Sequence, residues 1–203
     1  MFDLVWEYPA TPLNRPDYHA DSDRVEERMS GVIWKLERAQ YVSEQGDEAW
    51  DAFVDGDWPL VMAIYESERD AIRKAVEEEA KQGVEFRRLR IVELPPSSYI
   101  RWELPSLRIS AECGRLIRVL DARRIADLER KYPLPEMLVC GDHALYHVQY
   151  DEQKVPIGAR KIDDRQIVGS AAASVAALYA QAEPLTDFVE REITPLGPPK
   201  YAE

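Results

Sequence analysis

Charged and aromatic side chains alternate with apolar ones in the segment SSYIRWEL, residues 97–104. Tyr99, Arg101 and Glu103 could bind an anion in a polar pocket, because a guanidinium group holds a carboxylate or phosphate through two parallel hydrogen bonds. The same side chains could instead form a structural ion-pair network that fixes this segment to a sheet. The residue types alone leave both interpretations open.

The conformation of this segment decides which of its side chains can meet. In a helix, Tyr99 and Glu103 are four residues apart and share a face, whereas Arg101 points elsewhere. In a strand, all three would share one face. Ser97 is a good helix cap and favours the helix, whereas the alternation of polar and apolar residues favours the strand. We expect a helix, which Pro105 keeps short unless a second turn continues past it.

Other residue patterns give little indication of catalysis or metal binding. Cys140, His143 and His147 have a spacing that zinc sites can use. If residues 143–150 form a strand, however, the two histidines lie about 13 Å apart at roughly 3.3 Å per residue and cannot share an ion. The chain contains no G-x-S-x-G elbow, phosphate loop or dinucleotide fingerprint. We therefore expect no catalytic residue, no metal and no cofactor.

Charge is distributed unevenly along the 203 residues. The net charge is −12, which repels nucleic acid, and we expect no direct nucleic-acid contact. Residues 1–84 carry a net charge of −11, whereas residues 85–132 contain ten arginines and carry +4. The basic third could face the acidic third inside one domain. It could also form a surface that binds an anionic ligand or an acidic partner.

The sequence shows no targeting or membrane segment. No apolar run reaches the roughly 20 residues of a membrane-spanning helix. The N-terminus has neither the basic start nor the apolar core of a secretory signal. Two cysteines do not make a disulfide framework. We expect a cytoplasmic protein without membrane contact.

Periodicity and turn residues predict an α+β fold. The expected strands are residues 2–6, 84–94, 115–121, 137–140, 143–150 and 155–161, and residues 32–41 could form an edge strand. The expected helices are residues 23–30, 47–54, 64–82, 123–131, 164–182 and 185–192. This order predicts N-terminal helices packed on a mixed, mainly antiparallel sheet, with a C-terminal helix. We expect an N-terminal arm (1–30), a single α+β domain (31–192) and a flexible tail (193–203).

Several short patterns follow one another between residues 30 and 190. They are WKLERAQYVSEQGDEAWDAFVDGDW, AKQGVEFRRLRIVELPPSSYIRWEL, GRLIRVLDARRI, GDHALYHVQYDE and IGARKIDD. In this order they resemble an uncharacterised actinobacterial family, classed as a domain of unknown function. Its members are often encoded beside helix-turn-helix regulators of the lambda-repressor type.

The resemblance rests on individual positions. The family pattern matches Tyr99, Arg101, Glu103, Leu104, Gly114, Ile117, Arg118, Asp142, Tyr150, Asp151 and Gly158. The chain departs from it at Arg115, where the family tends to have an acidic residue, and at His143, where it tends to have arginine.

Two functions follow as expectations. The first is a non-catalytic regulatory or protein-interaction domain, for which the resemblance implies a helix-turn-helix transcriptional regulator as partner. The alternative is a small-molecule binding protein or enzyme that holds an anionic ligand in an Arg/Tyr/Glu pocket. Its candidate ligand-binding residues are Tyr99, Arg101, Glu103, Arg118, Asp142 and Tyr150.

Overall fold

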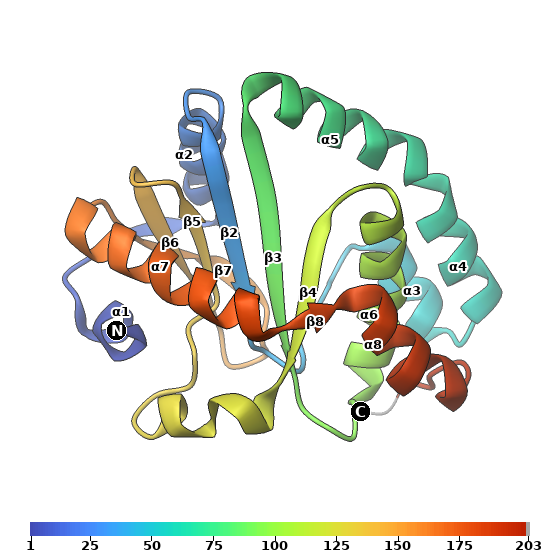
Figure 1. Ribbon diagram of the computed structural model, residues 1–203. Coiled ribbons are helices and arrows are strands. Elements are labelled where there is room, and N and C mark those ends of the chain that lie inside the picture. The colour runs from blue at the N-terminus through green and yellow to red at the C-terminus, as the bar shows by residue number, and fades with distance from the viewer. Residues whose placement is uncertain (202–203) are drawn as a thin grey trace.

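The computed structural model describes residues 1–201, which fold around a mixed sheet in the strand order β1-β7-β6-β5-β2-β3-β4-β8 (Figure 1). The strands are Thr11–Asn14 (β1), Gly31–Glu37 (β2), Val84–Val92 (β3), Leu116–Asp121 (β4), Met137–Cys140 (β5), Ala144–Tyr150 (β6), Pro156–Ile162 (β7) and Glu183–Pro184 (β8). β2, β3 and β4 are parallel to one another, and the other neighbouring pairs are antiparallel. The expected α+β class, with a mainly antiparallel mixed sheet, is confirmed.

Helices cover both faces of this sheet. The α-helices are Phe2–Glu7 (α1), Arg15–Glu26 (α2), Glu48–Val54 (α3), Trp58–Ser67 (α4), Arg69–Gln82 (α5), Ser98–Glu112 (α6), Arg165–Gln181 (α7) and Leu185–Phe188 (α8). Shorter helical turns are Ala122–Glu129, Val189–Ile193 and Thr194–Leu196. Within the described residues, no helix is both long and apolar enough to cross a bilayer.

One face of the sheet is packed against the C-terminal helix α7. Strand alternation directs Trp34 and Leu36 of β2 and Leu89 and Ile91 of β3 to this face, where they join Val168 and its neighbours on α7. Figure 1 shows α7 crossing the strands on this face. These contacts form one of the two largest apolar clusters of the molecule and fix the central strands against the expected C-terminal helix.

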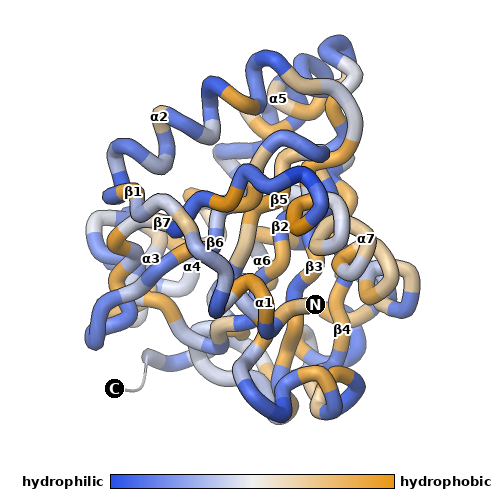
Figure 2. The backbone as a smooth tube through the Cα atoms, turned by 90° about the vertical axis from the view of Figure 1, so that its left-hand side faces the viewer, coloured by the Kyte–Doolittle hydropathy of each residue, from blue (hydrophilic) through white to orange (hydrophobic). Residues whose placement is uncertain are grey.

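The opposite face carries two separate helical covers. Helices α3, α4 and α6 pack over β3 and β4 in a second apolar cluster, which includes Trp50, Trp102 and Val119. Helix α2 covers the other side, where Tyr18 and Val25 pack against a smaller cluster around Tyr146. Figure 2 shows that α2 and α5 are largely hydrophilic, whereas the central strands are mostly hydrophobic. The central strands are therefore left partly uncovered between the two groups of helices.

Several expected elements have different forms or bounds. Residues 2–6 are helical rather than extended, and the two buried residues of α1, Phe2 and Val5, are three positions apart, as in a helix. A short apolar run does not distinguish the two conformations by periodicity alone. The segment expected at the sheet edge is central, because β2 pairs with both β3 and β5. Residues of the expected arm form α1, β1 and α2, and β1 pairs with β7.

The helices also differ from expectation at their ends. The expected helix 64–82 is divided at Glu68 into α4 and α5, and Gly83 ends α5 in a left-handed conformation. The helix 23–30 is instead the C-terminal part of α2, and residues 122–129 are 3-10 rather than α-helical. α6 is a helix, as expected, and continues past Pro105 to Glu112.

Candidate functional site

A cleft of about 600 Å³ opens on the sheet face that carries two helical covers. Its floor consists of side chains from β2 and β3, and α6 forms one wall. Residues 39–49 form a second wall, and α2, β6 and β7 bound the far side. This volume lies in the range of small-molecule sites, which makes the cleft the first candidate for function.

Opposite charges face one another on the floor. Strand alternation places Lys35 and Glu37 of β2 on the same face as Arg88 and Arg90 of β3, and the register sets Lys35 beside Arg88 and Glu37 beside Arg90. Lys35 Nζ lies 3.0 Å from Glu37 Oε1, and Arg88 Nε lies 3.6 Å from Glu37 Oε2. Burial opposes ionisation of Glu37, but the charges of Arg88, Lys35 and Arg90 outweigh it and lower the pKa of this carboxyl.

Arg90 is the centre of this network and is only 1% exposed. Its Nε donates to Glu103 Oε2 at 2.8 Å, and its Nη1 donates to the Ile91 carbonyl at 3.2 Å. Burial raises the pKa of Glu103, and the charge of Glu37 adds to this rise, although Arg90 opposes it. Glu103 thus shares its buried arginine with other carboxylates, and its ionised form is less favourable than it would be in water.

Glu136, which precedes β5, connects the floor to the second wall. Its Oε1 accepts hydrogen bonds from the backbone N–H groups of Arg38 and Ala39. Burial raises the pKa of Glu136 despite these two donors and the nearby charge of Arg90. The carboxylate therefore fixes the chain where it leaves β2 and enters the wall.

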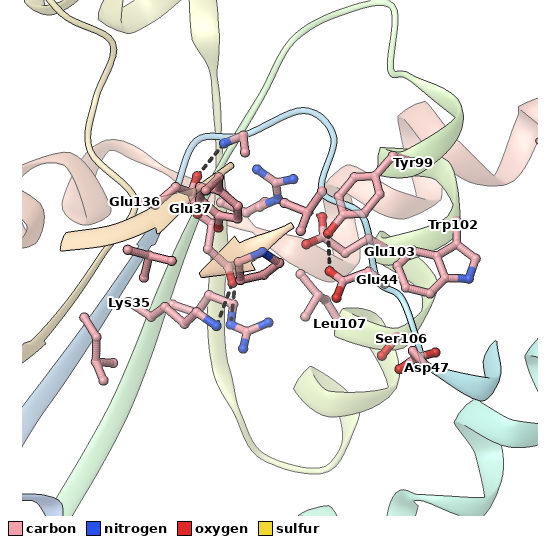
Figure 3. Close-up of a pocket in the computed structure, with 18 of the residues that line it drawn as sticks. Lys35, Glu37, Glu44, Asp47, Tyr99, Trp102, Glu103, Ser106, Leu107 and Glu136 are labelled. Carbon is pink, nitrogen blue, oxygen red and sulfur yellow. Dashed lines mark hydrogen bonds and ion pairs between the residues drawn. The ribbon is translucent and has the colours of Figure 1, made fainter. Parts of the chain in front are cut away.

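Aromatic residues line the α6 side of the cleft, and their polar atoms are bonded within the protein. Tyr99 donates its hydroxyl to Glu44 Oε1 at 2.9 Å, and Figure 3 shows Tyr99, Glu44 and Glu103 pointing toward one another. Trp102 Nε1 donates to the Ala49 carbonyl at 3.2 Å, and the Tyr65 hydroxyl donates to the Trp102 carbonyl at 3.2 Å. A molecule in the cleft would therefore meet mainly the ring surfaces of these residues.

Three of the six expected ligand-binding residues line the cleft: Tyr99, Glu103 and Tyr150. Tyr99 and Glu103 share a face of α6, as four-residue spacing in a helix requires. Tyr150, at the end of β6, faces them from the far side, and burial raises its pKa.

The structure places the other three expected residues elsewhere. Arg101 points away from the cleft and donates through Nη2 to the carbonyls of Leu196, Gly197 and Pro198 at 3.0, 3.0 and 3.3 Å. Arg118 lies over the Tyr179 ring of α7, with 4.8 Å from its guanidinium carbon to the ring centroid. Asp142 is exposed in the turn between β5 and β6.

The residues that sequence reasoning missed come from strands distant in the chain. Glu37, Arg88, Arg90 and Glu136 meet only because β2 lies between β3 and β5. A local signal exists in Lys35 and Glu37, which alternate with the apolar residues of a strand. Polar residues at alternate positions are common on solvent-facing strands, so this signal does not identify a cleft.

The spacing of Cys140, His143 and His147 does not produce a metal site. Burial lowers the pKa of His147 on β6 to about 4 and raises that of Cys140 on β5 to about 12. His143 is exposed in the turn between these strands. Among residues 1–201, no three His, Cys, Asp or Glu side chains are grouped to hold a metal ion.

Comparison with known proteins gives a family without an assigned activity. No curated protein matches the chain. Residues 20–190 match the family described as a domain of unknown function, DUF6879. This match includes α6 and the strands β2, β3, β5, β6 and β7, which line the cleft, whereas Arg15, Tyr18 and His19 of α2, which also line it, precede the matched residues. The chain therefore belongs to the DUF6879 family.

Proposed function

We propose that this protein is a non-catalytic regulatory domain whose cleft binds a small polar molecule. The charged side chains around Arg90 support the proposal, because this group lines a cleft of about 600 Å³ at the centre of the sheet. Buried ion pairs often contribute no net stability compared with apolar residues of similar volume. Charged groups that remain accessible from a cleft of this size are typical of a ligand site.

The regulatory part of the proposal concerns a protein partner. We propose a helix-turn-helix transcriptional regulator, the partner that the family resemblance implies. The acidic first third of the chain supports this choice, because DNA-binding surfaces are basic and complementary charge favours association. Asp51, Asp55 and Asp57, which are exposed on and just after α3, offer part of this acidic surface.

Co-purification from native lysate, with mass spectrometry of both proteins and metabolites, tests both parts. Three chains are compared: the wild type, Ser106→Trp and Ser170→Trp. Ser106 lies on α6 and lines the cleft, so an indole at this position would project into it and narrow it. Ser170 is exposed on α7, on the opposite face of the sheet, and provides a matched control.

We expect a metabolite to be retained by the wild type and by Ser170→Trp but lost from Ser106→Trp, while all three chains retain their folded circular dichroism. Retention by Ser106→Trp would exclude the cleft as the site. A metabolite without any protein partner would refute the regulatory role and leave the binding role. A protein partner without any metabolite would refute the binding role and leave the regulatory role.

A further inference from the structure

We propose that the molecule held in the cleft carries a positive charge, as an amine, guanidinium or quaternary ammonium group. The charged group would lie at the acidic wall formed by Glu44, Asp47, Glu48 and Glu68. This inference rests on the proposed binding function and specifies the chemistry of the ligand.

The balance of charge in the cleft opposes an anionic ligand. Seven carboxylates and four basic side chains line it. The three basic residues of the floor are already paired: Lys35 and Arg88 with Glu37, and Arg90 with Glu103. The fourth, Arg15, lies at the start of α2 on the far side. The floor is thus electrically balanced, and an anion would have to displace a carboxylate to gain a cationic partner.

The acidic wall, in contrast, has no balancing cation. Within the part of the chain that the structure describes, Glu44, Asp47, Glu48 and Glu68 take part in no ion pair with a basic side chain. Glu44 accepts from the Tyr99 hydroxyl, and Asp47 caps α3 by accepting from the Trp50 N–H.

Within this wall, the charge of Asp47 acts on Glu68. Burial, and then the charge of Asp47, raises the pKa of Glu68. A cation placed between these carboxylates would relieve that repulsion and would be attracted to the net negative charge of the cleft.

Aromatic residues beside the acidic wall suit the same ligand. Tyr65 and Trp102 line the cleft with Glu68 and Ala49, and their polar atoms are bonded to carbonyl groups. An organic cation is attracted to the face of an aromatic ring, and the attraction increases when water is excluded. Because Tyr65 and Trp102 are only 5% and 6% exposed, they add a small apolar surface, and the carboxylates without a balancing cation carry the preference for a cationic ligand.

The test uses defined probes and the full chain. Agmatine and choline serve as cations, and glutarate and inorganic phosphate as anions, each titrated by calorimetry at low ionic strength. The variants are Glu68→Gln, Glu48→Gln and Ser106→Trp, which narrows the cleft. The control is Glu77→Gln, which removes the same charge from the exposed face of α5, where Glu77 makes no ion pair among the described residues.

We expect at least one cation to bind and each acidic-wall variant to weaken it about tenfold, the loss of one charged hydrogen bond. Glu77→Gln should leave the dissociation constant within about twofold, because an exposed distant charge is screened, and Ser106→Trp should abolish binding. If the anions bind, and Ser106→Trp blocks them, the cleft is a ligand site but this inference is wrong. If Ser106→Trp affects no probe, the proposed function itself fails. If neither cation binds at millimolar concentration, the inference is overturned.

Discussion

Arg90 should be among the residues whose replacement destabilises this protein most. Its side chain is 2% exposed and has the carboxylates of Glu103, Glu37 and Glu136 around it. Arg90→Met keeps much of the volume but removes the charge and leaves these carboxylates without their shared partner. Removing one member of a buried ion pair costs about 3–5 kcal/mol of the free energy of unfolding. For about 200 residues this corresponds to a fall in Tm of roughly 6–20 °C.

The loss should also depend on pH. The pKa values of Glu103 and Glu136 are raised in the folded state, so their stabilising contribution is present below their unfolded pKa. That contribution is lost as the pH rises through the folded pKa. Without Arg90 both pKa values should rise further. The difference between Arg90→Met and wild type should therefore be larger near about pH 8 than near about pH 5.

Urea denaturation at several pH values measures both effects. The control is Arg87→Met, on the opposite face of β3, where Arg87 is 34% exposed and pairs with Glu85. A surface pair contributes about 1 kcal/mol or less, so the control should lose far less stability. Equal losses for the two variants would refute the reasoning, and so would a loss at Arg90 that does not change with pH.

Three further outcomes are expected. His147 has a pKa lowered from 6.5 to about 4, so the free energy of unfolding should fall as the pH drops through this window, and His147→Leu should remove roughly 3 kcal/mol of that fall in urea titrations. Gly158 has φ +147°, and an added Cβ would lie 2.0 Å from the Leu13 carbonyl oxygen, so Gly158→Ala should separate β1 from β7 and speed amide exchange in β1. Gly169 is within α7 with open space around it, so Gly169→Ala should raise the unfolding free energy by up to about 1 kcal/mol, measured by the same denaturation.

Local patterns predicted the part of the site that lies on one helix. Ser97 caps α6 by accepting from the Ile100 N–H at 3.2 Å, as its position before the helix suggested. The four-residue spacing then predicted that Tyr99 and Glu103 share a face and that Arg101 points elsewhere, and both were correct. Residue type and the family pattern favour Arg101 as a ligand residue, but helical geometry directs its side chain away from the cleft, to the carbonyls of Leu196 and Gly197.

The remainder of the site depends on contacts that local patterns do not contain. Glu37 and Glu136 are 99 positions apart and meet because β2 pairs with β5 in one register. Alternation within a strand shows which residues share a face, but it does not show which strand lies alongside. An edge position for residues 32–41 would leave Lys35 and Glu37 in solvent, whereas pairing of β2 with both β3 and β5 places them on the floor of the cleft.

Hydrogen–deuterium exchange with the most strongly retained metabolite tests the central claim most directly. The claim predicts protection confined to the cleft, in the segment 37–49 and in α6, with the same pattern in Ser170→Trp and none in Ser106→Trp. Protection at another surface, or a pattern in Ser106→Trp equal to that of the wild type, would contradict the claim that this cleft is the binding site.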